Sequence, residues 1–220
     1  MSLRTEELIG WIRKAAAPAS GLLIPVSGGS DGALCYWLCR QAYPDKTVAI
    51  HAGSGLQSRE WFERIGPVEY VDTPGEHAER EEMRWARFLS RSLARSSWLV
   101  GSRNRTEDLL GTYSLSSRLA TFLPIVGSWK SSVLEMCAEV GVPQEIIASS
   151  LRADPDCGRP AELAAIPYGL IEVFLKVRAE GMAEKELSAL TTAQITYLDA
   201  IYRRNSFKKS LPTRGASGLG

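Results

Sequence analysis

The residues best suited to chemistry stand together at positions 27–31, with the sequence SGGSD. They follow an apolar run, Leu22–Val26, that predicts a short buried strand, and they precede a helix-like segment that ends at Gln41. Backbone N–H groups in such a turn and at a helix N-terminus bind anions, and phosphate suits them well. The two glycines let the backbone turn sharply and approach a ligand closely. Because Asp31 would repel a bare phosphate, we interpret it as a ligand of the Mg²⁺ that accompanies a nucleotide.

This loop matches neither the G-x-x-x-x-G-K-[ST] phosphate loop nor the G-x-G-x-x-G dinucleotide fingerprint. It resembles the S-G-G-x-D-S pyrophosphate loop of the adenylating PP-loop ATP pyrophosphatases. The resemblance implies that ATP and pyrophosphate bind to Ser27, Gly28, Gly29, Ser30, Asp31 and Gly32. A glycine- and serine-rich turn without a ligand is the alternative that this fragment alone leaves open.

A second polar turn follows a predicted strand at 98–101, before a helix that opens with Thr106, Glu107 and Asp108. A carboxylate at this point is well placed to hold Mg²⁺ against phosphate oxygens. Asn104 with Glu107 three residues later is also a capping-box pattern, which needs no ligand. Taken alone, the turn favours capping. Together with the loop at 27–31, it favours a metal ligand at Glu107.

The remaining pattern alternates between strands and helices. Strands are predicted at 22–26, 47–51, 68–71, 98–101 and 122–125, and helices at 31–41, 58–65, 76–95, 131–139, 168–179 and 184–204. This order predicts an α/β fold with a doubly wound, parallel, five-stranded sheet, helices on both faces and a helical C-terminal part. Ligands of such Rossmann-like sheets bind beyond the carboxyl ends of the strands, where the strand order switches. Residues 149–166 are polar and contain proline, and we expect a long loop there that acts as a lid.

Composition limits the class of protein. The chain has 220 residues, of which 45% are hydrophobic, which suffices for one domain with a substantial core. We expect that domain to span residues 1–212, with a flexible tail at 213–220. The formal net charge of +1 argues against nucleic-acid and membrane partners, and no apolar stretch approaches 18 residues. The N-terminal pattern is an amphipathic helix rather than a signal peptide, so we expect a cytoplasmic protein.

Further segments resemble, in order, the motifs of the NAD synthetases of the ammonia-dependent type, which belong to the PP-loop superfamily. Residues 101–107, GSRNRTE, are similar to that family's G-T-G-N-K-S-E, and residues 141–147, GVPQEII, to its G-V-P-x-x-I-I. Similar but weaker matches are Leu123-Pro124-Ile125 with Lys130, Ala153-Asp154, Pro167-Tyr168 with Ile171-Glu172, and Phe207-Lys208-Lys209 with Pro212. Their ordered succession over nearly the whole chain identifies the protein as a divergent member.

The resemblance implies an enzyme, an amide-forming C–N ligase that cleaves ATP to AMP and pyrophosphate. In that family the carboxylate of deamido-NAD forms an acyl-adenylate with ATP, and ammonia then displaces AMP to give NAD. The resemblance implies that Asp31 and Lys130 are catalytic, that Asp31 and Glu107 bind Mg²⁺, and that Lys130 and Lys208 contact the phosphates of ATP. It further implies substrate contacts from Arg84, Asn104 and Asp154.

Several positions depart from the family pattern. Gly32 stands where the family has a second serine, and residues 113–120 lack both aspartates of Y-G-D-G-G-A-D. Gly127 and Arg152 also replace the family's aspartate and its serine or threonine. The substrate half therefore departs further than the nucleotide half. Two alternatives stay open: a divergent ligase that adenylates a different carboxylate, and a nucleotide-binding paralogue without catalysis. Adenylation of RNA is a weaker alternative, because the chain has neither a net basic charge nor an added RNA-binding segment.

The predicted helix 76–95 carries arginines at three- or four-residue spacing: Arg80, Arg84, Arg87, Arg91 and Arg95. Like charges at this spacing are unfavourable unless acidic groups compensate them. In the resembling family the corresponding helix lies at a dimer interface, and we therefore expect a homodimer. A chain filled by one synthetase-like domain leaves no room for a glutaminase, so we expect free ammonia or a separate glutaminase subunit as the nitrogen source.

Overall fold

A computed structural model describes residues 1–53, 55–71, 81–153 and 159–210. Within these residues the sheet has four parallel strands: β1 (Leu22–Pro25), β2 (Thr47–Ala52), β3 (Val68–Val71) and β4 (Trp98–Leu99). Their order is β3-β2-β1-β4. The chain first winds outward from β1 to β3 and then crosses back to β4. The strand order therefore switches between β1 and β4, which is where a doubly wound sheet binds its ligand.

The predicted fifth strand at 122–125 is wrong. In the described residues this segment makes only an isolated parallel bridge between Val100 and Phe122. Pro124 has no backbone N–H to continue a ladder, and the chain turns at once, with the N–H of Ser128 bonded to the carbonyl of Ile125 at 2.9 Å. The doubly wound α/β class is confirmed with a smaller sheet than we predicted.

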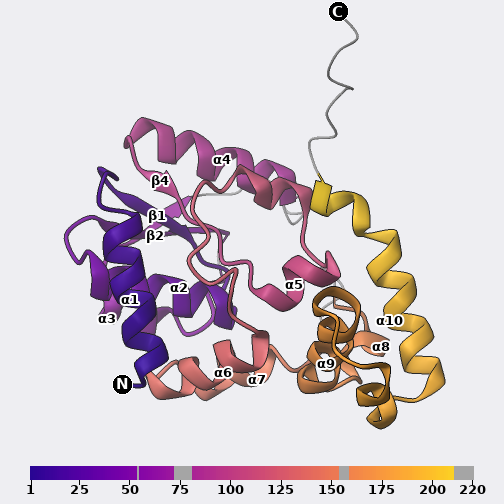
Figure 1. The fold of residues 1–220 in the computed structure, drawn as a ribbon. Helices are drawn as coiled ribbons and strands as arrows, with labels where there is room; N and C mark the ends of the chain where they lie inside the picture. The colour runs from indigo at the N-terminus through magenta and orange to yellow at the C-terminus, as the bar shows by residue number, and fades with distance from the viewer. Residues whose placement is uncertain (54, 72–80, 154–158, 211–220) are drawn as a thin grey trace, which may run out of the picture.

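Helices cover both faces of this sheet (Figure 1). One face packs against α1 (Leu3–Ala15), α2 (Ser30–Ala42), α3 (Arg59–Ile65), α6 (Lys130–Glu139) and α7 (Gln144–Ser149). The other face packs against α4 (Glu81–Ala94). Alternation along β1 explains this arrangement, because Leu22 and Ile24 belong to the first core and Leu23 to the second. The predicted residues 76–80 of the α4 segment lie outside the described residues.

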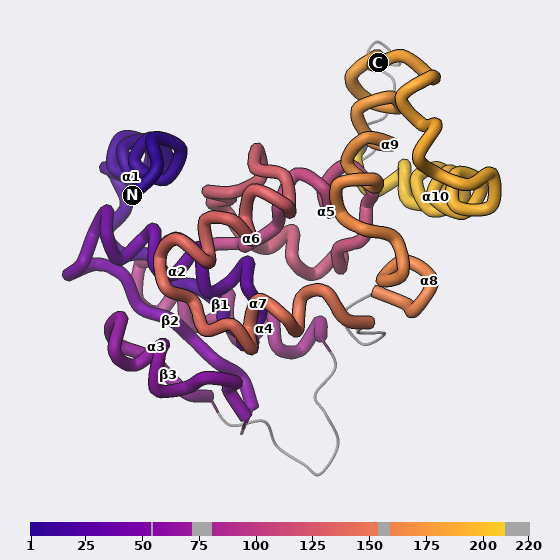
Figure 2. Tube along the Cα trace, turned by 90° about the horizontal axis from the view of Figure 1, so that it is seen from below, coloured from indigo at the N-terminus to yellow at the C-terminus, as the bar shows by residue number. Residues whose placement is uncertain are grey.

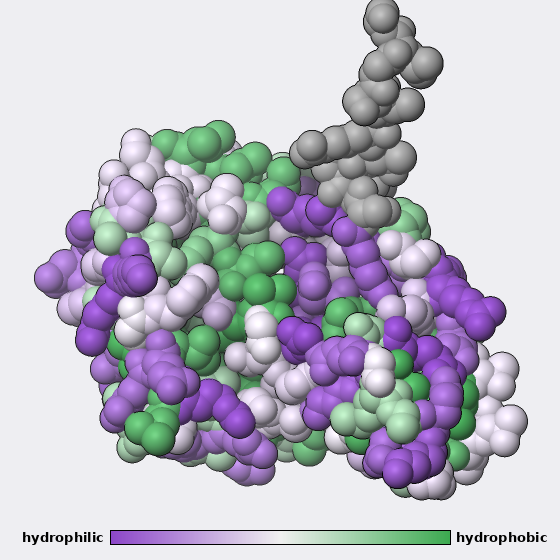
Figure 3. Space-filling model, viewed as in Figure 1, coloured by the Kyte–Doolittle hydropathy of each residue, from purple (hydrophilic) through white to green (hydrophobic). Residues whose placement is uncertain are grey.

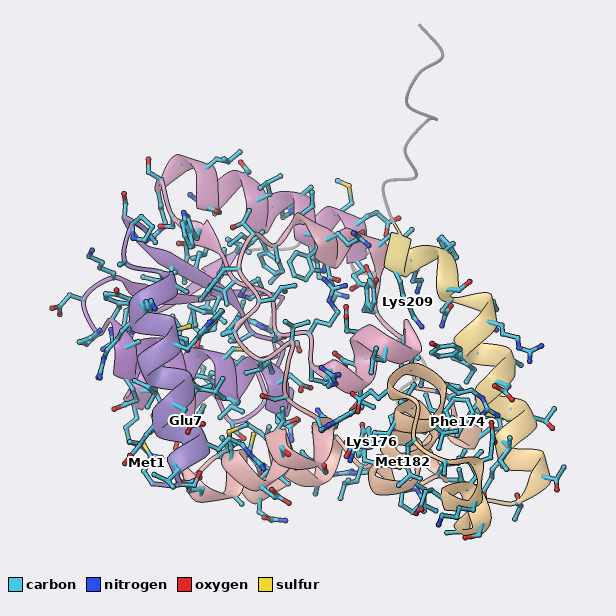
Figure 4. All side chains as sticks on the ribbon, in the orientation of Figure 1. Met1, Glu7, Phe174, Lys176, Met182 and Lys209 are labelled. Atoms are coloured by element: carbon cyan, nitrogen blue, oxygen red, sulfur yellow. The ribbon has the colours of Figure 1, made fainter. Side chains whose placement is uncertain are left out.

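The C-terminal part forms a second group of helices beside the sheet (Figure 2). It comprises α5 (Arg105–Leu110), α8 (Ala161–Ala164), α9 (Tyr168–Glu180) and α10 (Thr192–Arg204), with the short 3₁₀ turns η3 (Glu184–Ala189) and η4 (Ser206–Ser210). A further 3₁₀ turn, η1 (Leu115–Leu119), packs on α4 instead. The shared core of the C-terminal group contains Leu110, Phe174 and Leu198, and Figure 4 shows Phe174 within this group. The helical C-terminal part is thus confirmed.

Two predicted boundaries in this part are wrong. The segment 184–204 is not one helix, because Leu190 is extended and Thr191 begins α10 with a capping box to Gln194. The segment 149–166 is not one long loop, because α7 runs to Ser149 and α8 occupies Ala161–Ala164. Residues 154–158 of the predicted lid lie outside the described residues.

The surface offers no membrane-crossing segment in the part of the chain that the structure describes. None of its helices is both long and apolar enough to cross a bilayer. Figure 3 shows apolar residues over α4 and in the middle of one face, and many hydrophilic residues around the C-terminal helices.

Candidate active site

The loop that joins β1 to α2 presents a helix N-terminus to the switch point of the sheet. Gly29 is the N-cap of α2 and offers no side chain, so no N-cap side chain accepts a hydrogen bond from the N–H groups of the first turn. Gly28 has a φ of +90°, and a Cβ at this residue would lie 2.9 Å from the Cβ of Gln57. Backbone conformation and space therefore both require glycine at position 28.

Asp31 and Lys130 form an ion pair at this helix N-terminus. The side chain of Asp31 is 17% exposed and that of Lys130 only 5%. The Lys130 Nζ also donates to the Oγ of the fully buried Ser30 at 2.8 Å. The structure thus brings together a carboxylate, an ammonium and a hydroxyl that sequence reasoning assigned to the phosphates.

Asn104 joins the second polar turn to the same place. Its Nδ2 donates to the Oδ1 of Asp31 at 2.9 Å. Its Oδ1 accepts the N–H of Glu107 at 3.0 Å and completes a capping box at the start of α5. The capping interpretation is therefore confirmed, and the same side chain also contacts Asp31. We call Ser30, Asp31, Asn104 and Lys130 the site cluster.

Glu107 lies beside the site cluster in a setting that disfavours its charge. Burial and the negative charge of Asp31 raise the pKa of Glu107 to about 8, although Lys130 and the backbone N–H of Asn104 oppose the rise. A cation would relieve this repulsion. No group of three or more potential metal-ligating side chains occurs among the described residues. Two carboxylates fit a Mg²⁺ that arrives with phosphates and water as its other ligands.

Lys130 is positioned by residues on α5 and α9 whose role sequence reasoning missed. Its backbone N–H donates to Thr106 Oγ1 at 3.0 Å, and that hydroxyl donates to Glu172 at 3.3 Å. Glu172 is 4% exposed and also accepts the N–H and hydroxyl of Ser131 at 2.9 and 2.6 Å. The Ile171-Glu172 match gave the position of this carboxylate in the sequence, but not its contacts.

Residues of the segment 149–166, which we predicted to be a loop, also line the site. Ser150 Oγ lies 2.7 Å from Ser30 Oγ, and its carbonyl accepts bonds from Tyr168 and Arg159. The guanidinium of Arg159 lies 4.0 Å from the centroid of the Tyr168 ring. Nothing in the sequence pattern singled out Arg159 or Ser150, because both stand in an irregular stretch.

The other predicted site residues are placed as follows. Ser27 is exposed, and Lys208 Nζ donates to the carbonyls of Gly111 and Tyr113 at 2.9 and 2.7 Å. Arg84 is half-buried on α4, and no bond among the described residues joins it to the site cluster. Asp154 lies outside the described residues. The phosphate role of Lys208 and the substrate roles of Arg84 and Asp154 stay predictions.

Known proteins resemble this chain in sequence over most of its length. The model of the family described as NAD synthase matches residues 76–212, which is more than half of the chain. The loop at 27–31 lies before this match. The NH(3)-dependent NAD(+) synthetase of Helicobacter pylori (strain HPAG1) is 27% identical over 86% of this chain and 85% of its own length. That of Carboxydothermus hydrogenoformans is 27% identical over 95% of each chain.

Solved structures share the fold. The NH3-dependent NAD synthetase from Campylobacter jejuni superposes with a TM-score of 0.76 at 20% identity and covers 98% of this chain and 100% of its own. An NMN synthetase from Francisella tularensis has the same TM-score of 0.76 at 18% identity, over 96% of each chain. At these identities the two structures establish the architecture alone.

Proposed function

Because this chain belongs to the NAD synthase family, we propose that it is an ATP-dependent ligase that converts a carboxylate to an amide. The proposed reaction takes deamido-NAD, ammonia and ATP to NAD, AMP and pyrophosphate. One observation carries the proposal: the buried ion pair of Lys130 and Asp31 stands at a helix N-terminus that no side chain caps. This arrangement suits a polyphosphate better than any neutral ligand.

The chemistry requires activation, because a carboxylate is a poor electrophile. One carboxylate oxygen attacks the α-phosphorus of ATP, the bond to the α,β-bridging oxygen breaks, and its electron pair leaves with pyrophosphate. The lone pair of ammonia then attacks the acyl carbon, the bond to AMP breaks, and the nitrogen gives a proton to water. Both steps place negative charge on phosphate oxygens, so electrostatic stabilisation is the main task of the protein.

The residues of the site divide this task. The N–H groups at the start of α2 and the Lys130 ammonium neutralise the departing pyrophosphate. Lys130 pairs with Asp31, so it exchanges this carboxylate for phosphate when the nucleotide binds. Asp31 and Glu107 would hold Mg²⁺, which supplies further neutralisation of phosphate charge. Asn104 keeps Asp31 oriented during this exchange.

Two acids are candidates for the substrate. Deamido-NAD is the leading candidate because the sequence relatives are NAD synthetases. The deamido form of NMN is the second, because an NMN synthetase matches the fold as well as an NAD synthetase does. The departures at Gly32 and at 113–120 favour the two broader alternatives, a different carboxylate or a nucleotide-binding protein without catalysis.

Release of pyrophosphate tests the proposal directly. Purified protein is assayed with Mg-ATP and ammonium, alone, with deamido-NAD and with the deamido form of NMN. We expect release only with one acid present, and its loss in Asp31→Ala. Asp45→Ala is the matched control, because Asp45 is exposed in the turn before β2, at the opposite end of the strands from the site cluster.

The outcomes separate the alternatives. Release that needs an acid and Asp31 supports the ligase. Binding of Mg-ATP, measured by calorimetry, without release for either acid favours a different carboxylate or a protein without catalysis. Failure of the wild-type chain to bind Mg-ATP would contradict the proposal.

We further propose that the protein is a cytoplasmic homodimer that uses α4 as its interface and takes ammonia free or from a separate glutaminase. Met83 and Leu93 on α4 are 52% and 69% exposed, and Figure 3 shows apolar residues gathered over this helix, as at an interaction surface. Arg91 of this helix and Arg95, which follows its last residue, both pair with Glu69, so part of the basic stripe is already neutralised. Analytical ultracentrifugation of wild type and Leu93→Glu tests the dimer, with Leu3→Glu as an exposed control on α1.

A further inference from the structure

Arg159 is held rigidly although it stands in an irregular segment. Its Nη1 donates to the carbonyl of Ser150 at 2.9 Å, and its guanidinium lies 4.0 Å from the centroid of the Tyr168 ring. The Tyr168 hydroxyl donates to the same carbonyl at 3.1 Å. An arginine stacked on an aromatic ring and bonded to a fixed carbonyl has lost most of its rotamer freedom before any ligand arrives.

The same contacts connect Arg159 to the phosphate loop. Ser150 Oγ lies 2.7 Å from Ser30 Oγ, which accepts a bond from Lys130 Nζ at 2.8 Å. Lys130 Nζ also lies 6.0 Å from the centroid of the Tyr168 ring. Tyr168 therefore has both cations beside it, and Arg159 belongs to the wall of the site rather than to the outer surface.

Arg159 also has hydrogen-bonding capacity that the described residues leave unused. Its Nε is buried and has no hydrogen-bond partner there, and no carboxylate of the described residues forms an ion pair with it. A buried donor without a partner destabilises the protein until a ligand accepts its hydrogen bond. Burial lowers the pKa of the Arg159 guanidinium, and the nearby negative charge of Glu107 opposes this effect. A preorganised, partly desolvated guanidinium with a free donor is suited to an anionic ligand.

We propose that Arg159 binds the phosphate groups of the nucleotide opposite Lys130 and remains bound to pyrophosphate as it leaves. This inference rests on the proposed function and adds a residue to its site. When the bond from the α-phosphorus to the bridging oxygen breaks, the electron pair stays on pyrophosphate and increases its charge. The guanidinium fork binds two phosphate oxygens at once, whereas the Lys130 ammonium acts as a point charge.

Binding of Mg-pyrophosphate, followed by isothermal titration calorimetry, tests the role of Arg159. We compare the full-length wild type with Arg159→Met and Arg159→Lys. Arg152→Met is the matched control, because it removes the same charge from an exposed side chain of the same segment. We expect Kd to rise at least tenfold in Arg159→Met and by a smaller factor in Arg159→Lys, which keeps the charge but not the fork. Arg152→Met should bind like wild type, and circular dichroism verifies that each variant is folded.

A second measurement separates phosphate binding from a purely structural role. In the pyrophosphate-release assay, Arg159→Met should lower kcat/KM for ATP and leave KM for the acid unchanged. Equal Mg-pyrophosphate affinity in wild type and Arg159→Met would overturn the inference and leave the proposed function intact. A wild-type chain that binds neither Mg-ATP nor Mg-pyrophosphate would overturn both. A rise in KM for the acid alone would assign Arg159 to the acid substrate and also overturn the inference.

Discussion

The helices α2, α5 and α6 begin around the site cluster, but their N-termini are used in different ways. At α5 the side chains of Asn104 and Glu107 cap the first turn reciprocally. At α6 the first N–H groups donate to Thr106 and Glu172. At α2 the N-cap is Gly29, which offers no side chain. Capped helix ends fix the position of Glu107 and Lys130, whereas the uncapped end keeps its donors for a ligand.

This difference has a physical reason. An N-cap side chain and a phosphate compete for the same N–H groups, because both supply oxygen acceptors. A helix end that binds an anion must therefore forgo its own cap, and neighbouring capped helices supply the rigidity. The contrast between α2 and the other two helices can be removed or sharpened by single substitutions.

The largest effect is expected when α2 receives a cap. Gly29 has a φ of −83°, and a Cβ there would meet only Ser27 Oγ at 3.7 Å, so Gly29→Asp fits. Its carboxylate would cap α2 and repel phosphate. Like charges in contact cost several kcal/mol, so we expect Mg-ATP affinity to fall by about 100-fold or more. Unfolding in urea should show unchanged or slightly higher stability.

Gly29→Ala is the control for this substitution, because it adds the Cβ without a cap or a charge. Calorimetry should rank Mg-ATP affinity as wild type first, Gly29→Ala second and Gly29→Asp last. Equal affinity for Gly29→Asp and wild type would mean that the start of α2 does not bind the nucleotide.

Removing the acceptor that caps α6 should have the next largest effect. Glu172→Gln keeps the shape of the side chain but replaces one carboxylate oxygen with a donor, and so opposes the bonds from Thr106 and Ser131. Bonds to a charged group contribute about 1.5–3 kcal/mol each, so we expect a loss of about 2 kcal/mol in the free energy of unfolding. Urea denaturation measures this loss. Glu162→Gln, at an exposed position of α8, should change it by less than about 0.5 kcal/mol.

The pH dependence of nucleotide binding should report on Glu107. The pKa of Glu107 is raised to about 8 in the folded chain. Between the ordinary pKa of a glutamate and pH 8, Glu107 is therefore protonated in the folded chain but ionised in the unfolded chain. Stability from this group is therefore present at low pH and is lost as pH rises toward 8. Binding of a Mg-nucleotide expels the proton. Nucleotide affinity should therefore increase about tenfold for each unit by which the pH is raised, up to pH 8, and then level off.

A non-hydrolysable ATP analogue, titrated from pH 6 to 8, provides this measurement. Glu107→Gln is the control, because it carries no titrating proton and should retain only the pH dependence of the nucleotide itself. The same slope in wild type and Glu107→Gln would show that Glu107 does not titrate on binding.

The smallest effect is expected from removing the cap of α5. Asn104→Ala loses the capping bond, which contributes about 1 kcal/mol, and also the bond to Asp31. Asn104→Ser can cap α5 but cannot reach Asp31 with an amide. Thermal unfolding should therefore show recovery of stability in Asn104→Ser but not in Asn104→Ala. Nucleotide affinity should be lowered in both, and an unchanged affinity in Asn104→Ser would contradict the role of Asn104 in orienting Asp31.

Much of the fold could be predicted because its signals are local. The apolar run Leu22–Val26 and the glycines after it predicted β1 and the start of α2 nearly to the residue. Two signals misled. Phe122–Ile125 has the composition of a strand, but Pro124 removes the donor that a ladder needs. Residues 184–204 have helical composition, but the capping box at Thr191 divides them.

The sequence by itself determined which groups are available: a glycine-rich turn after a strand, a carboxylate in it, and a capping pattern after a later strand. These depend on residues close together in the chain, where backbone sterics and hydrogen bonding act directly. Only the tertiary structure decided that Asp31 meets Lys130, 99 residues later, and that Arg159 lies beside them across the ring of Tyr168. Such contacts depend on how the helices pack on the sheet, because packing places the side chains of distant elements within reach of one another.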